Sequence, residues 1–407
     1  MRFLFSLFQI VLFILLIDFY TFKAFKIVFR KFYIGKIKII FGLTYWLVSL
    51  FFIVIFILIR SQLAKIYNFH SINFLFFIIG LFLMIYIPKI IIFIFHLVED
   101  IINLVIRLIF RNRNRLKFIT ISGIVISLIP FVCVLYGMVS GRYNYKVKYQ
   151  QIEFENLPLN FNNFRIVQIS DFHIGTLNGN NKELQKIVNI VNSLNPDVIF
   201  FTGDLINNFA DEVKGTEKIL SGFKAKFGKY SILGNHDYGD YSNWLSPEDK
   251  KENLNKLIAW HKILGFDLLL NNADSIAIGN EKIAILGVEN WGLPPFRQYG
   301  NLSKALASAN KISFKILLSH DPSHWTKEVI KKTDIELTLS GHTHGFQFGY
   351  EFGKRKWSPI KYKYPQWSGL YKDQKQYLYI NVGLGVIGYP GRIGMPPEIT
   401  LIILKRK

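Results

Sequence analysis

Residues 164–175 read FRIVQISDFHIG, and the carboxyl-terminal half of the chain is best understood outward from this stretch. Its first seven residues are mostly β-branched or apolar, which predicts a buried β-strand. The predicted strand ends at Asp171, Phe172 and His173. An aspartate and a histidine two positions apart can bind one ion where the chain turns out of a sheet, although most such tripeptides are ordinary surface loops.

The same pattern recurs along the chain. Four more apolar runs, each predicted to be a strand, end in polar residues: 197–202 before Gly203-Asp204, 229–233 before Gly234-Asn235-His236-Asp237, 313–318 before Ser319-His320-Asp321, and 335–339 before Ser340-Gly341-His342-Thr343-His344-Gly345. Open α/β sheets bind ligands at the carboxyl ends of their strands. Carboxylates with imidazoles suit a hard-to-borderline divalent metal ion. The only cysteine, Cys133, lies in an apolar run, so no thiolate competes.

The ordered set D-x-H, G-D, G-N-H-D, H and G-H-x-H resembles the calcineurin-like metallophosphoesterase superfamily, and especially its membrane-associated bacterial branch with a GHTHG signature. All five motifs occur in the family's order between Asp171 and His344, and the GLG…PPEI segment extends the likeness. Residues 1 to about 142 lie outside it. The resemblance implies a four-layer α-β-β-α sandwich of two mixed sheets. It also implies hydrolysis of phosphate esters by metal-activated water.

The resemblance further implies a role for each motif residue. Two divalent ions (Mn²⁺, Fe, Zn²⁺ or Mg²⁺) would be bound, one by Asp171, His173, Asp204 and His344, the other by Asp204, Asn235, His320 and His342. A carboxylate can bridge two ions, which is the role implied for Asp204. His236 would act on the phosphate, and Asp237 would orient His236 by a hydrogen bond. Taken singly, each residue is more often a cap or a satisfied polar group, and only the joint set favours a site.

Two features near the carboxyl end bear on the substrate. Many relatives have Gly-Gly after the last histidine, whereas this chain has Gly345, Phe346 and Gln347. Phe346 therefore leaves substrate size open. Residues 354–367 (KRKWSPIKYKYPQW) mix cations with aromatic rings. A solvated loop is the commoner explanation of such a segment, and a lid that touches anionic lipid headgroups or the substrate is the alternative.

The first 140 residues hold the apolar excess of a chain that is 51% hydrophobic. Apolar runs predict membrane spans near 3–22, 39–59, 72–98 and 118–139, followed by a phosphoesterase domain at 143–407. Between the last two spans, residues 99–110 place isoleucine and valine at helical spacing. This spacing is typical of an amphipathic helix on the membrane surface and equally of a continuation of the third span.

The basic residues predict how these spans are oriented. Most cations of the first 140 residues lie in the loops after the first span and before the fourth, namely Lys23, Lys26, Arg30, Lys31, Lys36 and Lys38, and Arg107, Arg111, Arg113, Arg115 and Lys117. Positive loops stay cytoplasmic, so the catalytic domain should be extracytoplasmic, on a bacterial inner or plasma membrane. Arg142, Lys146 and Lys148, just beyond the fourth span, weaken this prediction. Topology also explains the net charge of +21 more simply than a nucleic-acid partner does.

Several functions stay open within this prediction. Monoesters, diesters and pyrophosphates are all possible substrates, as is a lipid-linked phosphate. One alternative is a lipid pyrophosphatase resembling UDP-diacylglucosamine hydrolases, although an outside site argues against a nucleotide sugar. Another is a membrane sensor or transport protein whose phosphoesterase domain only binds a ligand. A complete ligand set disfavours this, and Asp18 is the only acid expected in the first three spans, without the paired charges of an ion pathway. The oligomeric state is not predicted.

Overall fold

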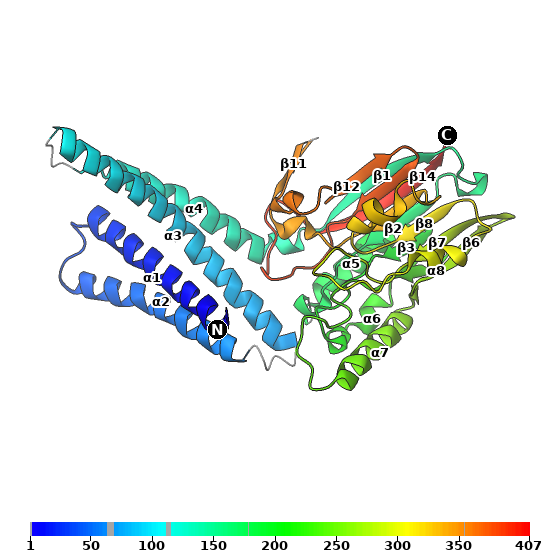
Figure 1. Ribbon diagram of the computed structural model, residues 1–407, viewed down its shortest axis with the longest axis horizontal. Helices are drawn as coiled ribbons and strands as arrows, with labels where there is room; N and C mark the ends of the chain where they lie inside the picture. Colours follow the sequence, from blue (N-terminus) through cyan, green and yellow to red (C-terminus); the bar gives the residue numbers. More distant parts are fainter. Residues whose placement is uncertain (1, 63–68, 111–114, 178, 354) are drawn as a thin grey trace. The chain divides into compact units, whose positions relative to one another are not determined.

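The computed structural model describes residues 2–62, 69–110, 115–177, 179–353 and 355–407. The chain divides into two compact units, which are considered separately (Figure 1). The helical unit comprises residues 1–66 and 75–136, and the catalytic unit comprises residues 67–74 and 137–407. The chain passes from the first to the second between Tyr136 and Gly137. The predicted domain boundary at 142 and 143 remains a prediction.

The helical unit is built from α1 (Arg2–Val28), α2 (Gly35–Gln62), α3 (Phe69–Phe110) and α4 (Phe118–Val139). Within the described residues, three helical stretches are long and apolar enough to cross a membrane: Gly35–Ile59, Ile72–Phe110 and Phe118–Tyr143. Helix α1 covers the predicted first span but is not among these three, so its role as a span stays a prediction. Helix α3 continues through Pro88 to Phe110, which makes the amphipathic stretch a continuation of the third helix.

A buried ion pair joins three helices of this unit. The Oδ1 atom of Asp18 accepts a hydrogen bond from Lys89 Nζ at 2.5 Å, and Oδ2 accepts one from the Tyr86 hydroxyl at 2.7 Å. The Tyr45 hydroxyl donates to the Asp18 carbonyl at 2.9 Å. Asp18 is fully buried. The expectation that the first three spans lack paired charges is therefore wrong, because Lys89 of α3 neutralises Asp18 of α1.

A second polar cluster shows that α1 and α3 run in the same direction. Asp100, late in α3, accepts hydrogen bonds from Tyr20 at 2.7 Å and Lys23 at 2.8 Å, late in α1. Arg115, just before α4, also pairs with Asp100. The loop after α1 and the loop before α4 therefore begin at the same end of the helical unit. These are the two loops that carry most of its positive charge.

The catalytic unit contains two mixed sheets of six strands each among the described residues. The first has the order β1 (Lys146–Phe154), β14 (Glu398–Arg406), β2 (Arg165–Ile169), β3 (Val198–Phe201), β4 (Lys229–Ser231) and β5 (Asp267–Leu268). The second has the order β12 (Gly369–Asp373), β13 (Gln376–Ile380), β9 (Leu337–Ser340), β8 (Lys315–Leu318), β7 (Glu281–Gly287) and β6 (Asn272–Ile278). Strand β1 lies at an edge, as predicted.

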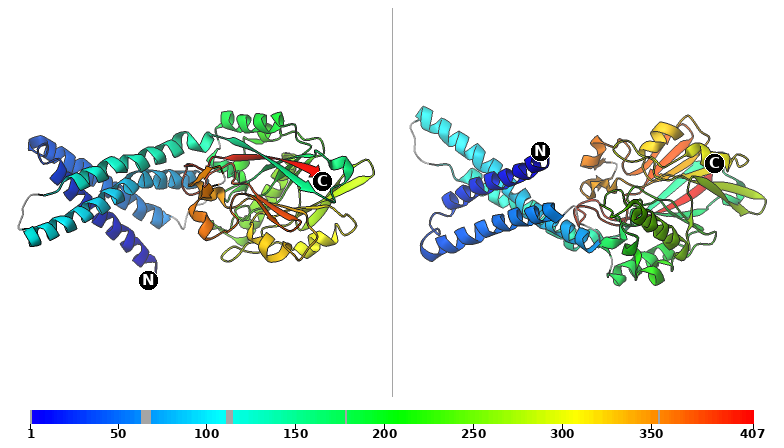
Figure 2. Two further views of the ribbon diagram at one scale, coloured as in Figure 1. Left: turned by 90° about the horizontal axis from the view of Figure 1, so that it is seen from above. Right: turned by 60° about the horizontal axis from the view of Figure 1, so that its bottom comes forward.

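The sheets and helices form the predicted four layers. In β2, Ile166 belongs to the core between the sheets and Val167 to the core beneath the helices, because successive side chains point to opposite faces. Helices α5 (Asn181–Ser193) and α7 (Pro247–Ile263) cover the first sheet, while α8 (Leu302–Ala307) and the turn Trp325–Val329 cover the second. In both views of Figure 2, the green and the yellow helical segments lie on opposite sides of the strands.

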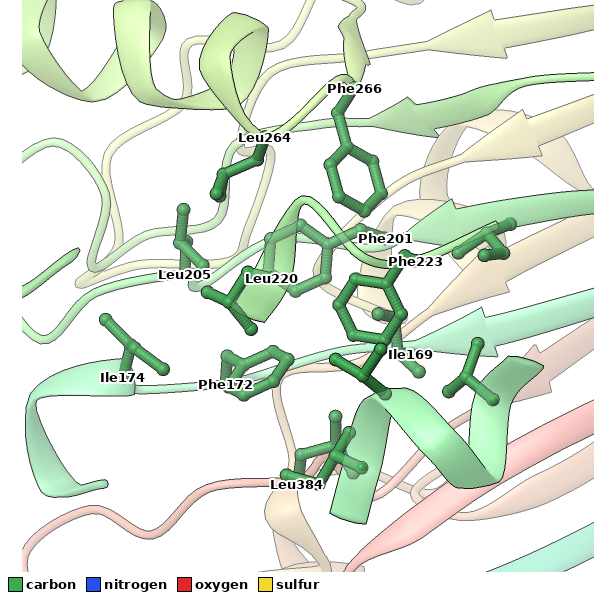
Figure 3. Packing of buried hydrophobic residues seen from close by; sticks show 14 of the residues in the cluster. Ile169, Phe172, Ile174, Phe201, Leu205, Leu220, Phe223, Leu264, Phe266 and Leu384 are labelled. Carbon is green, nitrogen blue, oxygen red and sulfur yellow. The ribbon is translucent and has the colours of Figure 1, made fainter. Parts of the chain in front are cut away.

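The core beneath the helices also fixes the loops that follow the strands. Phe172, directly after the first predicted metal ligand, packs with Ile169, Phe201 and Leu384 (Figure 3). Three strands were not predicted: β12 and the separate antiparallel pair β10 (Tyr350–Phe352) and β11 (Arg355–Trp357). Their exposed side chains gave no apolar alternation for the sequence analysis to detect.

Replacing Lys89 by Met should destabilise the helical unit, because Asp18 would keep a buried charge without its cation. Losing one partner of a buried ion pair typically costs about 3–5 kcal/mol. The matched control combines Lys89→Met with Asp18→Asn, which removes both charges and should unfold closer to the wild type. Thermal unfolding of the purified chain in detergent measures the difference. Equal losses in the single and double variants would contradict the pairing.

Candidate metal centre

The polar residues predicted from the five strand ends come together in two groups. Within the described residues, Asp171, His173 and His344 form one group, and Asp204, His320 and His342 form the other. In each group, one donor atom per residue lies within 4.8 Å of the others. These residues directly follow β2, β3, β8 and β9, whose parallel carboxyl ends meet at one edge of the sandwich. Each group has the residue types that bind a divalent ion.

The first group is closely packed and buried. The Nε2 atoms of His173 and His344 lie 3.1 Å apart, and His344 Nε2 lies 3.2 Å from Asp171 Oδ1. Asp171 and His173 are fully buried. Asp204 reaches this group from the next strand, with its Oδ2 atom 3.7 Å from His173 Nε2.

The second group shares that same oxygen. Asp204 Oδ2 lies 3.1 Å from His320 Nε2, and His342 Nδ1 lies 3.3 Å from the same His320 nitrogen. Asn235 joins this group, because its Oδ1 atom lies 3.1 Å from His320 Nε2. The Asn235 amide nitrogen donates to the Tyr241 hydroxyl at 2.9 Å, which turns the amide oxygen toward the histidines. One carboxylate therefore approaches both groups.

The hydrogen bonds around the rings fit the predicted metal ions. His320 Nδ1 donates to the Thr202 carbonyl at 2.7 Å, so Nε2 carries the lone pair that faces the group. His342 Nε2 lies 2.8 Å from the Tyr364 hydroxyl, which leaves Nδ1 to face His320. Lone pairs and carboxylate oxygens that converge on one point repel each other unless a cation lies between them. The donor set therefore fits two divalent ions.

The backbone of the site is strained where it carries these residues. Five of the predicted ligands have positive φ angles: Asp171 (49°), His173 (43°), Asp204 (58°), His342 (71°) and His344 (51°). Each such conformation costs on the order of 1–3 kcal/mol for a residue other than glycine, and such residues cluster at functional sites. Gly341 shows how tight the packing is, since a Cβ atom there would collide with Ser170 and Asp171.

Charges within the site compete with burial. Burial by itself would raise the pKa of Asp204, but the nearby rings of His320 and His236 hold it well below the ordinary aspartate range. Burial would lower the pKa of His320, but the Asp204 carboxylate raises it to about 10. Burial lowers the pKa of His342 to about 4, which favours a neutral ring. Asp204 is thus an anion that attracts positive charge from every side.

His236 lies beside the first group, but a different residue orients it than predicted. Its ring centroid is 5.0 Å from that of His173, and its Nδ1 donates to the Asn207 carbonyl at 2.8 Å. Asp237 instead accepts backbone N–H groups, from Asp204 and Leu205 at 2.9 Å and from Gly234 at 2.8 Å. The predicted bond from Asp237 to His236 is therefore wrong. The short distance along the chain favoured it, whereas the fold directs the carboxylate into the neighbouring loop.

Tyr364 and Asp321 are site residues that the sequence analysis did not identify. The Tyr364 hydroxyl lies between His342 Nε2, at 2.8 Å, and Asp321 Oδ2, to which it donates at 3.2 Å. Both residues are buried. This chain of bonds fixes the tautomer and direction of the His342 ring. Tyr364 lies in the cation-and-aromatic segment, and only the fold brings it to a histidine 22 residues earlier in the chain.

Arg392 supports the last histidine from behind. Its guanidinium is buried and donates to the carbonyls of Gly385 at 2.7 Å, Val382 at 2.9 Å and Gly383 at 3.0 Å. One of its nitrogens lies 3.4 Å from His344 Nδ1. Arg392 therefore holds the loop after β13 against the first group, as a structural part of the site.

Replacing Tyr364 by Phe should weaken binding of one metal ion, because His342 loses the hydroxyl that holds its Nε2 atom. Loss of such a partner typically lowers affinity by about 10–100-fold. The matched control is Tyr362→Phe, two positions earlier on a ring that is 78% exposed, which should bind like the wild type. Equilibrium dialysis of the full chain against Mn²⁺ gives both affinities. Equal weakening at both groups, or in both variants, would contradict the assignment.

Comparisons with known protein families agree with this geometry. A model described as a probable calcineurin-like phosphoesterase transmembrane domain matches residues 1–142. The calcineurin-like phosphoesterase model matches residues 164–346, which include every predicted ligand. The amino-terminal region is thus a transmembrane domain.

Relatives show the same combination. A Danio rerio protein named "Transmembrane protein with metallophosphoesterase domain" is 31% identical over 289 residues, which are 69% of this chain and 62% of the fish protein. The uncharacterized metallophosphoesterase YkuE of Bacillus subtilis is 32% identical over 264 residues, or 61% of this chain and 82% of that protein. The uncharacterized metallophosphoesterase Cj0846 of Campylobacter jejuni is 29% identical over 75% of this chain and 72% of its own length. This membrane protein belongs to the calcineurin-like metallophosphoesterase family.

Proposed function

We propose that this chain is a membrane-anchored phosphoesterase that hydrolyses phosphate ester bonds with two divalent metal ions. The observation that supports this most directly is the shared Asp204 oxygen, 3.1 Å from His320 and 3.7 Å from His173. When bound, two such ions neutralise phosphate charge and lower the pKa of water. Asp171, His173 and His344 would hold one ion, Asn235, His320 and His342 the other, and Asp204 both. Mn²⁺, Fe, Zn²⁺ and Mg²⁺ all fit these donors.

His236 is the proposed acid–base or charge-stabilising residue. Its Nδ1 atom is held by the Asn207 carbonyl, so Nε2 is the atom that can reach a phosphate oxygen beside His173. Its backbone N–H donates to Asp204 Oδ1 at 2.8 Å, which couples its position to the shared ligand. A positioned ring of this kind can donate a proton to the leaving oxygen or stabilise charge on the phosphoryl group.

The complete donor set also separates this proposal from a domain that only binds a ligand. A sensor or transport protein would not require carboxylate, amide and imidazole ligands to converge on two points. The buried pair of Asp18 and Lys89 does not favour transport, because both charges are satisfied by each other and by tyrosine hydroxyls.

Replacing Asp204 by Ala should remove both ions and abolish hydrolysis, because both groups lose their common ligand. Elemental analysis of the purified full chain, with a chromogenic phosphate ester and a diester as substrates, tests this. Asp211→Ala, on an exposed turn of the same loop, is the control and should keep metal and activity. Two ions still bound per chain in Asp204→Ala would refute the shared role.

Replacing His236 by Ala should leave metal content unchanged and slow hydrolysis by about 10²–10⁴-fold, the usual contribution of an acid–base group. The reason is that His236 contacts the site without belonging to either ligand group. Parallel measurements of kcat and bound metal distinguish the two possible roles. Loss of an ion together with the rate would make His236 a ligand.

We also propose that the catalytic unit faces away from the cytoplasm. The support is structural as well as compositional, because the positive loops after α1 and before α4 begin at one end of the helical unit. Lys23 and Arg115 both contact Asp100 there. That end would be cytoplasmic by the positive-inside rule, and α4 would then carry the chain outward to Gly137.

A reporter enzyme that is active only outside the cytoplasm tests this orientation in the bacterial inner membrane. Fused after Arg142 it should be active, and fused within 111–117 it should be silent, because α4 separates the two positions. Reporters that are active only inside the cytoplasm, fused at the same two points, supply the control and should show the opposite pattern. Activity of the first reporter at 111–117 would place the catalytic unit in the cytoplasm.

The proposed substrate is a lipid-linked phosphate or pyrophosphate. Phe346 lies two residues after the ligand His344, and its ring is 58% exposed. An apolar ring at that position suits a substrate with both a phosphate and an apolar part. Monoesters, diesters and pyrophosphates all remain within the proposal.

A further inference from the structure

The β10–β11 hairpin has two chemically different faces. Tyr350 pairs with Trp357 and Phe352 with Arg355 across the two strands, while the pair between them is Glu351 and Lys356. Side chains of paired residues point to the same face, and neighbours along a strand point to opposite faces. One face of the hairpin is therefore Glu351 with Lys356, and the other is mainly aromatic.

The face with Glu351 and Lys356 is bound to the rest of the catalytic unit. Glu351 accepts a hydrogen bond from the Ser368 hydroxyl at 2.9 Å and pairs with Lys148 of β1. Lys356 donates to the Ser368 carbonyl and lies 4.7 Å above the Tyr371 ring. These contacts fix which side of the hairpin faces the protein.

The opposite face is open. It consists of Phe348, Tyr350, Phe352, Arg355 and Trp357, and is called here the aromatic face. Phe352 is 83% exposed, Tyr350 51% and Phe348 44%. Trp357 lies between Phe348 and Tyr350, with ring centroids 6.2 and 6.3 Å away, so the rings form one continuous surface. Contiguous exposed rings usually mark a surface that binds something.

Phe346 shows that exposed rings are kept in this region at a cost in stability. Phe346 and Gln347 have φ angles of 57° and 56°, which glycine adopts without strain but which are unusual for a bulky residue. The Phe346 ring is more than half exposed, so the strain is not offset by burial of that ring in the core. Strain at such a position is typical of a residue kept for binding.

The base of the hairpin is close to the point where the chain leaves an apolar helix. Phe348 pairs with Ile393, and the Gly349 N–H donates to the Ile393 carbonyl at 3.0 Å. The next residue back, Arg392, donates its backbone N–H to the Gly137 carbonyl at 3.2 Å. Gly137 lies near the end of Phe118–Tyr143, one of the stretches able to cross a membrane. Only a few bonded residues therefore separate the hairpin from the end of that stretch.

We propose that the aromatic face docks into the headgroup–acyl boundary of the bilayer that holds the chain. Aromatic rings favour this boundary, where an apolar body and a polar edge are both satisfied. Arg355 lies on the aromatic face, and the exposed Lys361 and Lys363 follow in sequence, so the positive charge of the segment suits anionic headgroups. The occupant is a lipid surface, and the inference does not depend on which reaction the site catalyses.

The test uses the full chain in lipid nanodiscs, with Cys133→Ser removing the native cysteine. Phe352→Cys carries an environment-sensitive bimane label, and the discs contain phosphatidylcholine and phosphatidylglycerol, with or without bromine on the acyl chains. Bromine quenches only a label that it contacts. We expect loss of fluorescence at position 352 in brominated discs and a blue-shifted emission in both kinds of disc. Tyr350→Cys is a second reporter on the same face, used if Phe352→Cys does not fold.

The matched control is Leu245→Cys, because Leu245 is 79% exposed and lies outside the hairpin. Its label should keep its fluorescence in brominated discs. Equal quenching at both positions, or none at 350 and 352, would overturn the proposal. Pyrene excimer emission between two labelled chains in one disc, without quenching in discs that hold one chain, would assign the face to a second copy and would also overturn it.

Discussion

The attraction between the Asp204 carboxylate and the positive charge gathered around it is the constraint on which the catalytic unit depends. Its Oδ2 atom lies within 3.7 Å of one histidine from each group, and its Oδ1 atom accepts the His236 backbone N–H at 2.8 Å. No other carboxylate among the described residues approaches both groups so closely. The sandwich has to deliver four strand ends to one point for this to be possible, and the paired sheets do so because their central strands are parallel.

Two further buried carboxylates keep this arrangement rigid without belonging to either ligand group. Asp237 accepts backbone N–H groups from the loop after β3 and from the loop after β4, and so ties those loops together. Glu212 accepts backbone N–H groups from Asn207 at 2.8 Å and from Asn208 and Phe209 at 2.9 Å. Burial and the charge of Asp204 raise the pKa of Asp237 to about 8. These networks explain how the strained backbone of the ligands is held in place, since each buried N–H that they satisfy would otherwise be unpaired.

The helical unit follows the same physical logic in an apolar environment. Asp18 and Lys89 are acceptable there because each neutralises the other and two tyrosine hydroxyls complete the hydrogen bonds. The result is a connection among α1, α2 and α3 that apolar packing alone would not specify. The opposite charges near Asp100 tie the carboxyl ends of α1 and α3 together, where Arg115 also binds. Polar contacts thus fix which helix ends meet, and with them where the positive loops lie.

The sequence by itself determined the strands and their order, because buried strands need apolar runs and each run here ends in an Asp, Asn or His motif. It also determined which residues meet, since motif spacing and parallel strand ends leave few other arrangements for Asp171, Asp204 and His320. The long apolar helices were equally readable from composition. Only the tertiary structure decided contacts between residues distant in sequence: Lys89 with Asp18, Tyr364 with His342, and Asn207 in place of Asp237 beside His236. Such contacts depend on how loops fold over the sheets, where no periodicity constrains the chain, and so the local pattern could not reveal them.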